Sequence, residues 1–200
     1  MHGLVNRSIQ SFLQDTYGAP AWKVIRVAAG VKFRDFEAML DYPDELTHDL
    51  LDAACDHLDR PQSDLLEDLG TYLVIHPNMN AVRRLLRFGG HTFDEFIYSL
   101  EDLNDRLQLA MPDLELPPLE MCEFSASSFS LSCHWQTAGF GAVLLGILRA
   151  LADDYGALVL MELVTNPTDD GVTEAVRVEV LETAFASGRE FQLAVAAGAA

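Results

Sequence analysis

The hydrophobic pattern of this chain changes its period once, at a short proline-containing connector, and that change strongly constrains the fold. Before residue 111, apolar residues recur every three to four positions, as on one face of a helix. After residue 118, apolar and polar residues alternate in short runs, as in half-buried strands. The pattern therefore predicts an α+β fold, in which a helical N-terminal lobe precedes a four-stranded antiparallel sheet with a packed helix.

The helical part is expected to consist of several short helices. Gly18, Gly30, Pro61, Pro77 and the pair Gly89-Gly90 are the residues that most strongly punctuate it. The helices are predicted over residues 4–18, 22–29, 36–40, 43–60, 61–76, 79–88 and 93–110.

The second part is expected to contain two hairpins and one helix. Strands are predicted over residues 119–124, 129–135, 158–164 and 174–181, with a helix over 140–155 and a turn over 166–171. In the last strand, Val176, Val178 and Val180 alternate with charged residues, which indicates one buried face. The predicted organisation is a helical subdomain (1–110), a connector (111–118) and a β-β-α-β-β subdomain (119–200), together forming one domain.

Charge and cysteine content limit the kinds of partner and compartment. The chain has 31 acidic and 13 basic residues, for a net charge of −18, which disfavours binding to nucleic acid or to an anionic membrane surface. Its three cysteines do not form a disulfide framework, and the first residues lack the profile of a signal peptide. We expect an acidic, cytoplasmic protein.

One polar residue interrupts the apolar face of the helix predicted over residues 93–110. Leu100, Leu103 and Leu107 share that face at helical spacing. Asn104 lies four residues after Leu100 and three before Leu107, so its amide is expected to point towards the interior.

Several short segments, taken in order, resemble one known family. They include the opening Met1-x-Gly3-Leu4-Val5-Asn6, the glycine-containing helix around Leu69-Gly70, the run 85–90 and the pair Gly139-Phe140. Together with the run around Asn104, they resemble the heme nitric oxide/oxygen binding (H-NOX) family, the sensor module also found in soluble guanylate cyclase. The resemblance extends from about Met1 to Leu181.

The resemblance implies a function as well as a fold. It implies a heme cofactor, a diatomic gas as ligand and a non-catalytic sensory role. It also implies a stand-alone bacterial protein that acts on a separate signalling protein, such as a histidine kinase or a cyclic-nucleotide enzyme.

The chain departs from the family at two functional positions. Asn104 stands where the family has the histidine that binds the heme iron, and an amide is a weaker iron ligand than an imidazole. Cys133, Trp135 and Thr137 stand where the family has its Y-x-S-x-R motif, whose side chains bind the heme propionates. Losing the arginine leaves a buried carboxylate without its usual partner. These departures predict that heme is not bound in the usual way.

Few other residues of the chain could replace the missing iron ligand. His76 ends the helix before the pocket and is a candidate substitute ligand, whereas His48 and His57 lie in an acidic helix that we expect to face solvent. Cys122, Cys133 and His134 do not have the spacing of a zinc site, and His134 is expected on the opposite strand face from Cys133. We also find no phosphate-binding loop or nucleophile motif that would indicate an enzyme.

Two hypotheses therefore remain. The first is a degenerate member of the family, whose pocket is filled by side chains such as Trp135 or holds a small apolar ligand, and which acts through protein contacts. The second is a functional heme-based gas sensor in which a substitute ligand such as His76 binds the iron.

Overall fold

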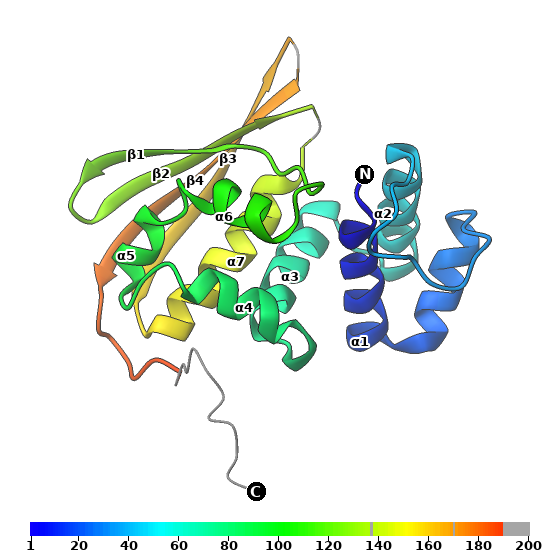
Figure 1. Cartoon of the computed structure of the whole chain (residues 1–200), viewed down its shortest axis with the longest axis horizontal. Helices are drawn as coiled ribbons and strands as arrows, with labels where there is room; N and C mark the ends of the chain where they lie inside the picture. Colours follow the sequence, from blue (N-terminus) through cyan, green and yellow to red (C-terminus); the bar gives the residue numbers. More distant parts are fainter. Residues whose placement is uncertain (137, 170, 190–200) are drawn as a thin grey trace, which may run out of the picture.

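The computed structural model describes residues 1–136, 138–169 and 171–189 (Figure 1). The elements in chain order are α1 (Gly3–Ala28), α2 (Asp44–Leu58), α3 (Gln62–Ile75), the 3-10 turn η1 (Pro77–Met79), α4 (Asn80–Arg87), α5 (Phe93–Tyr98), α6 (Leu103–Ala110), β1 (Leu119–Ser125), β2 (Ser128–Trp135), α7 (Phe140–Tyr155), β3 (Leu158–Thr168) and β4 (Gly171–Glu182). This order confirms the predicted helical part followed by β-β-α-β-β.

The four strands form one antiparallel sheet in the order β1-β2-β4-β3. Alternate residues of its two central strands are buried, among them Phe129, Leu131, Val176 and Val178, whereas Arg177 is exposed. The predicted alternation in the last strand is therefore confirmed. In Figure 1, α7 lies between this sheet and α3, and α1 and α2 form the opposite end of the molecule.

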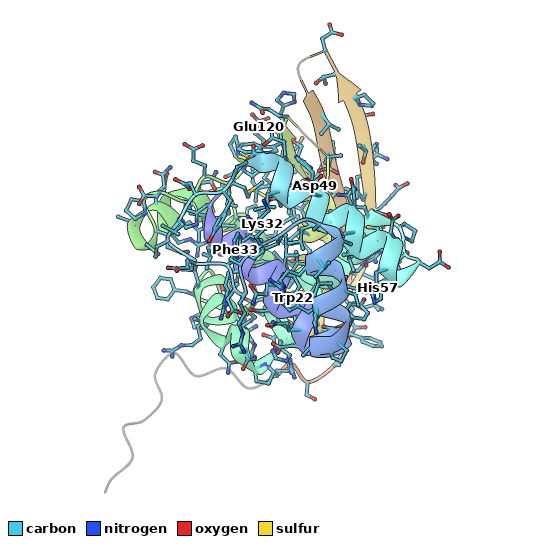
Figure 2. All side chains as sticks on the ribbon, turned by 90° about the vertical axis from the view of Figure 1, so that its right-hand side faces the viewer. Trp22, Lys32, Phe33, Asp49, His57 and Glu120 are labelled. Atoms are coloured by element: carbon cyan, nitrogen blue, oxygen red, sulfur yellow. The ribbon has the colours of Figure 1, made fainter. Side chains whose placement is uncertain are left out.

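The buried side chains form two clusters on either side of the contact between α3 and α7. One cluster joins the sheet, α7 and the short helices α4 to α6. The other joins α1, α2 and α3, and includes Trp22 and Phe36. Figure 2 looks onto this helical end, where Asp49 and His57 come from α2.

Helix α1 contains a break at the position where a helix end was predicted. Gly18 has φ +87°, in the left-handed region, and Pro20 follows it. The two arms on either side of Gly18 correspond to the two helices expected from the sequence, because glycine adopts this conformation readily and proline favours the first turn of a new helix.

The helical turns predicted over residues 36–40 do not form. The backbone N–H of Phe36 donates to the side-chain oxygen of Gln10 (2.8 Å), and that of Glu37 donates to the hydroxyl of Tyr42 (2.9 Å). These amides are bound by side chains rather than by helical carbonyls. The ring of Phe36 packs against Trp22 and Tyr42, so the apolar spacing here reflects packing of a turn.

The single helix predicted over residues 93–110 is two short helices. Between α5 and α6, the N–H groups of Leu100 and Leu103 bond to carbonyls three residues earlier, at Ile97 and Leu100. A guanidinium nitrogen of Arg106 donates to the carbonyl of Ser99 (2.6 Å) and fixes the break. The helical apolar spacing continues across the break, which explains why the sequence indicated one helix.

The second hairpin is longer than predicted, because β3 and β4 remain paired as far as Thr168 and Gly171. Pro167 was taken as part of the turn but lies in β3, an edge strand of the sheet. An edge strand tolerates proline because one side of its backbone has no ladder partner. No helix within the described residues is long and apolar enough to cross a membrane.

Candidate functional site

An apolar cavity of about 240 Å³ lies among α1, α3, α4, α6, the connector and α7. Leu100, Leu103 and Leu107 from the region around the helix break form part of its wall. Among the described residues that line this cavity, Ser8 is the only one with a polar side chain, apart from the thioether of Met111. We call it the leucine cavity. It can accommodate apolar groups, but it offers no charged or nitrogen-containing side chain.

A second cavity of about 160 Å³ is adjacent to the leucine cavity, and we call it the polar-edged cavity. The two share Val5, Leu69, Leu116, Phe140 and Val143 as lining residues. The second cavity also has polar side chains in its wall: Thr47, His48, Gln62, Glu115 and Trp135. Each cavity is smaller than the roughly 300–1,000 Å³ of typical small-molecule sites.

Asn104 is half-buried at the start of α6 and does not line either cavity. Its side-chain nitrogen donates to the carbonyl of Pro117, at a long distance of 3.5 Å. The leucines around it line the leucine cavity, as their shared face predicted. The amide itself contacts the connector, so it joins α6 to the connector rather than facing the cavity.

The structure separates the two described positions of the Y-x-S-x-R motif, Cys133 and Trp135. Trp135 lines the polar-edged cavity, whereas Cys133 is buried in β2 and lines neither cavity. Burial, reinforced by the charge of Glu174, raises the pKa of the Cys133 thiol to about 11. Thr137 lies outside the described residues. His134 is exposed on the opposite strand face from Cys133, as predicted, and its Nδ1 lies 3.1 Å from the hydroxyl of Thr173.

His76, the candidate substitute ligand, lies away from both cavities. Its ring stacks on Tyr72 with centroids 4.6 Å apart, and its Nδ1 is 3.6 Å from a carboxylate oxygen of Asp15. The hydroxyl of Tyr72 donates to the same carboxylate (2.6 Å), and this bond holds the pKa of Asp15 below its usual value. The geometry therefore gives no support to His76 as a ligand for a group held in the cavities.

His48 is the histidine that the sequence interpretation misplaced. It was expected to face solvent, but it is half-buried on α2 and lines the polar-edged cavity. The sequence did contain a signal, because the apolar Leu51 follows His48 by three positions and so lies on the same side of a helix. In the structure, Thr47 and Leu51 are both buried on the inner side of α2. His57, in contrast, is exposed as expected.

Glu174 is a second residue that sequence reasoning missed. Its side chain is buried, and one carboxylate oxygen accepts the N–H groups of Gly139 (3.0 Å) and Gly141 (2.8 Å). These amides begin α7, whose N-terminus attracts negative charge. Glu174 lies two and four positions before Val176 and Val178, so its side chain points to the same buried face of β4. This spacing was the available signal in the sequence. A carboxylate of the chain thus already occupies the anion-binding end of α7.

Buried charges join α4, which forms part of the cavity wall, to the C-terminal end of α7. Asp154 is 1% exposed and accepts bonds from the Nε (3.2 and 3.1 Å) and Nη2 (2.8 Å) of Arg83. The guanidinium of Arg87 lies 3.7 Å from the centroid of the Tyr155 ring. Because breaking one partner of a buried ion pair is costly, this cluster holds α4 in place beside the leucine cavity.

Within residues 1–136, 138–169 and 171–189, no three His, Cys, Asp or Glu side chains come together as a metal-binding group. Cys122 is exposed, whereas Cys133 is buried. The described part of the chain thus has one apolar and one polar-edged cavity.

Comparison with known proteins gives one family. A family model described as Haem-NO-binding matches residues 2–163. The chain is 26% identical over 166 residues to soluble guanylate cyclase gcy-31 of Caenorhabditis elegans, a match that covers 82% of this chain and 23% of that protein. It is 19% identical over 170 residues to soluble guanylate cyclase 89Da of Drosophila melanogaster, covering 85% and 26%. The chain thus spans about a quarter of these relatives.

Solved structures with the same fold carry the same family name. An H-NOX protein of T. Tengcongensis, in a mutant form, matches with a TM-score of 0.76 at 14% identity, covering 92% of this chain and 100% of that one. An H-NOX protein from S. oneidensis, in its Fe(II) ligation state, matches with a TM-score of 0.74 at 14% identity, covering 92% and 97%. At this identity the likeness shows the fold.

Proposed function

This chain belongs to the Haem-NO-binding (H-NOX) family, and from that premise we propose that it is a regulatory domain that does not hold heme in the family's usual way. The observation that carries the proposal is the composition of the cavity walls. The leucine cavity is apolar apart from Ser8, and Asn104 bonds to the connector instead of facing it.

The axial position supports this proposal. Heme iron in proteins is held by side chains such as histidine, cysteine, methionine or tyrosine. Among the described residues that line the leucine cavity, Met111 is the only one of these types. Asn104 is a neutral amide with a backbone partner, so it does not replace the strong ligand that a ferrous heme requires.

The propionate side supports it independently. Two carboxylates leaving water need cationic partners, ideally an arginine fork. No arginine or lysine is among the described residues that line either cavity, whereas Glu115 lines the polar-edged one. The amides at the start of α7 already bind the carboxylate of Glu174. The residues present therefore do not fit the family's heme.

The alternative, a functional heme-based nitric oxide or oxygen sensor, has one observation in its favour. The imidazole of His48 lines the polar-edged cavity, so it is a better candidate ligand than His76. This alternative requires an iron ligand on α2 rather than on α6, and it still leaves the propionates without an arginine or lysine among the described lining residues.

Absorption spectroscopy of the purified chain, titrated with hemin and then reduced, tests the proposal. We expect only the broad absorption of free hemin, because no described group in the leucine cavity binds iron strongly. A sharp Soret band that saturates at one heme per chain would support the alternative. In that case, loss of the band in His48→Ala but not in His76→Ala would identify the ligand.

We further propose that the domain acts through protein contacts on a separate signalling protein, such as a histidine kinase or a cyclic-nucleotide enzyme. The relatives named as soluble guanylate cyclases support this class of partner, because they contain a matching segment within a much longer chain. We also propose a non-enzymatic role in the cytoplasm, which is what the resemblance to the family implies.

A further inference from the structure

We propose that the leucine cavity binds a small, uncharged, apolar molecule of about the size of a substituted benzene. This inference rests on the proposed function, because a heme in the usual position would compete for the same space. It goes further by assigning a chemical class to the ligand, which the family membership does not supply.

The volume of the cavity supports a ligand of this size. An engineered apolar cavity of about 150 Å³ in another protein stays dry and binds benzene. The leucine cavity measures about 240 Å³ and has the same kind of wall. It is large enough for an aromatic ring with a short substituent, and too small for a typical drug-sized molecule.

The chemistry of the wall selects against polar ligands. A polar group that leaves water without a hydrogen-bond partner loses free energy. Ser8 supplies the only hydroxyl among the described lining residues, and no charged side chain lines the leucine cavity. A ligand with several polar groups would lose its hydration and gain little in exchange.

The surroundings select in particular against carboxylates. Phe140 lines both cavities, and the residues on either side of it, Gly139 and Gly141, already donate to Glu174. Glu115 lines the adjacent cavity. An anionic molecule of the same shape would find no arginine or lysine in the described walls, and would have a carboxylate, Glu115, in the wall of the adjacent cavity. The site therefore distinguishes ligands by charge as well as by size.

The position of the cavity couples ligand binding to the folded state. Its walls come from both halves of the chain: Leu73 of α3, Leu107 of α6 and Leu144 of α7 all contact the same space. A ligand that contacts them together binds the folded chain and not the unfolded one, so it must raise the melting temperature.

Thermal unfolding of the full chain with toluene and with benzoate tests the inference. The two probes share a ring and differ in charge. We expect toluene to raise the melting temperature by about 2–4 °C once it exceeds its dissociation constant several-fold, with a rise that follows the logarithm of its concentration. Benzoate is expected to have no such effect. No shift with toluene, or an equal shift with benzoate, would overturn the inference.

Two variants of α6 locate the site. Leu107→Phe fills the leucine cavity, because Leu107 is buried in its wall, and should abolish the toluene shift. Leu109→Phe is the matched control, because Leu109 is 88% exposed on the same helix, and should retain the shift. An unchanged shift in Leu107→Phe would place toluene elsewhere and overturn the inference.

Nuclear Overhauser effects keep the test decisive if Leu107→Phe fails to fold. In the native chain, toluene ring protons should contact methyl groups of Leu103, Leu107 and Leu144. Contacts confined to other methyl groups would refute the site.

The hemin titration separates this inference from the proposed function. Stoichiometric heme binding refutes the proposed function, whereas absent toluene binding without heme refutes only the ligand class.

Discussion

At the scale of single residues, Glu174 has the largest effect on the chemistry of the site. Its buried carboxylate neutralises the positive end of a 16-residue helix and removes that end as a binding position for another anion. Replacing Glu174 with glutamine keeps the shape and removes the charge. Because charge-assisted hydrogen bonds are about twice as strong as neutral ones, we expect Glu174→Gln to lower the free energy of unfolding by about 1–2 kcal/mol.

Urea unfolding monitored by circular dichroism measures this change. Glu179→Gln is the control, because Glu179 is exposed on the same strand and its replacement should alter the free energy of unfolding by less than about 0.5 kcal/mol. Equal stability of native chain and Glu174→Gln would show that the carboxylate does not stabilise α7.

The thiol of Cys133 gives a residue-scale prediction that depends on pH. Burial raises its pKa to about 11 from an ordinary value of 9.0. At pH 8 the native chain then holds roughly one hundredth as much Cys133 thiolate as an ordinary cysteine would, and the thiolate is the reactive form. We expect thiol reagents to label the exposed Cys122 first, and Cys133 only when the chain unfolds or the pH approaches 11.

Peptide mass spectrometry after timed labelling at pH 8 separates the two cysteines. Because folding raises this pKa from 9.0 to about 11, the unfolded chain releases the thiol proton at a lower pH than the folded chain does. The free energy of unfolding is therefore unaffected by this group below about pH 8 and falls as the pH rises from there towards 11. Rapid labelling of Cys133 in native chain at pH 8 would contradict its burial.

The sequence alone shows where the chain departs from a family motif. It does not show which contacts a residue makes, because these depend on tertiary packing. The proposed replacement of the axial histidine by Asn104 rests on one line of sequence. The hydrogen bond between Asn104 and Pro117 depends on how the connector folds back. His48 looked solvated because its helix is acidic. Its helical spacing to Leu51 indicated the inner face of α2, but only tertiary packing shows that this face lines a cavity.

At the scale of elements, the close crossing of α3 and α7 supports the walls of both cavities. A Cβ atom on Gly146 would lie 2.0 Å from the carbonyl oxygen of Glu67, and one on Gly70 would lie 2.1 Å from that of Val143. Each glycine thus allows the other helix to approach its backbone. We expect Gly146→Ala to force the helices apart and to destabilise the fold by about 1–3 kcal/mol or more.

Chemical denaturation of Gly146→Ala measures this loss of stability, and Arg149→Ala is the control variant. Arg149 lies on the same helix and pairs with Glu67 of α3 at the partly exposed surface, so its loss should cost less than about 1 kcal/mol. A destabilisation of Gly146→Ala no larger than that of Arg149→Ala would contradict the proposed close crossing.

Most elements follow from periodicity, and the exceptions have local causes. The helix over 140–155 and the start of the hairpin at 119 are found where the alternation and the glycines predict them. The break between α5 and α6 was missed because Arg106 stabilises it from outside the broken segment. The longer second hairpin was missed because Pro167 signals a turn in sequence but is tolerated at a sheet edge.

At the scale of the whole molecule, the structure keeps the H-NOX fold with cavity walls that suit apolar molecules. Two buried clusters meet at α3 and α7, and the two cavities lie beside this junction. The order of the elements could be read from the sequence, which also predicts that the usual iron and propionate partners are replaced. The sizes of the cavities could not, because they depend on the crossing of helices far apart in the chain.

The ferrous absorption spectrum of the native chain, recorded after addition of one equivalent of hemin per chain, tests the central claim most directly. Asn104→His measured in parallel shows whether the axial position alone is responsible. We predict that neither protein gives a saturable Soret band at one heme per chain, because the described cavity walls contain no arginine or lysine for the propionates. A sharp stoichiometric Soret band in the native chain, or tight heme binding by Asn104→His alone, would contradict the proposed function.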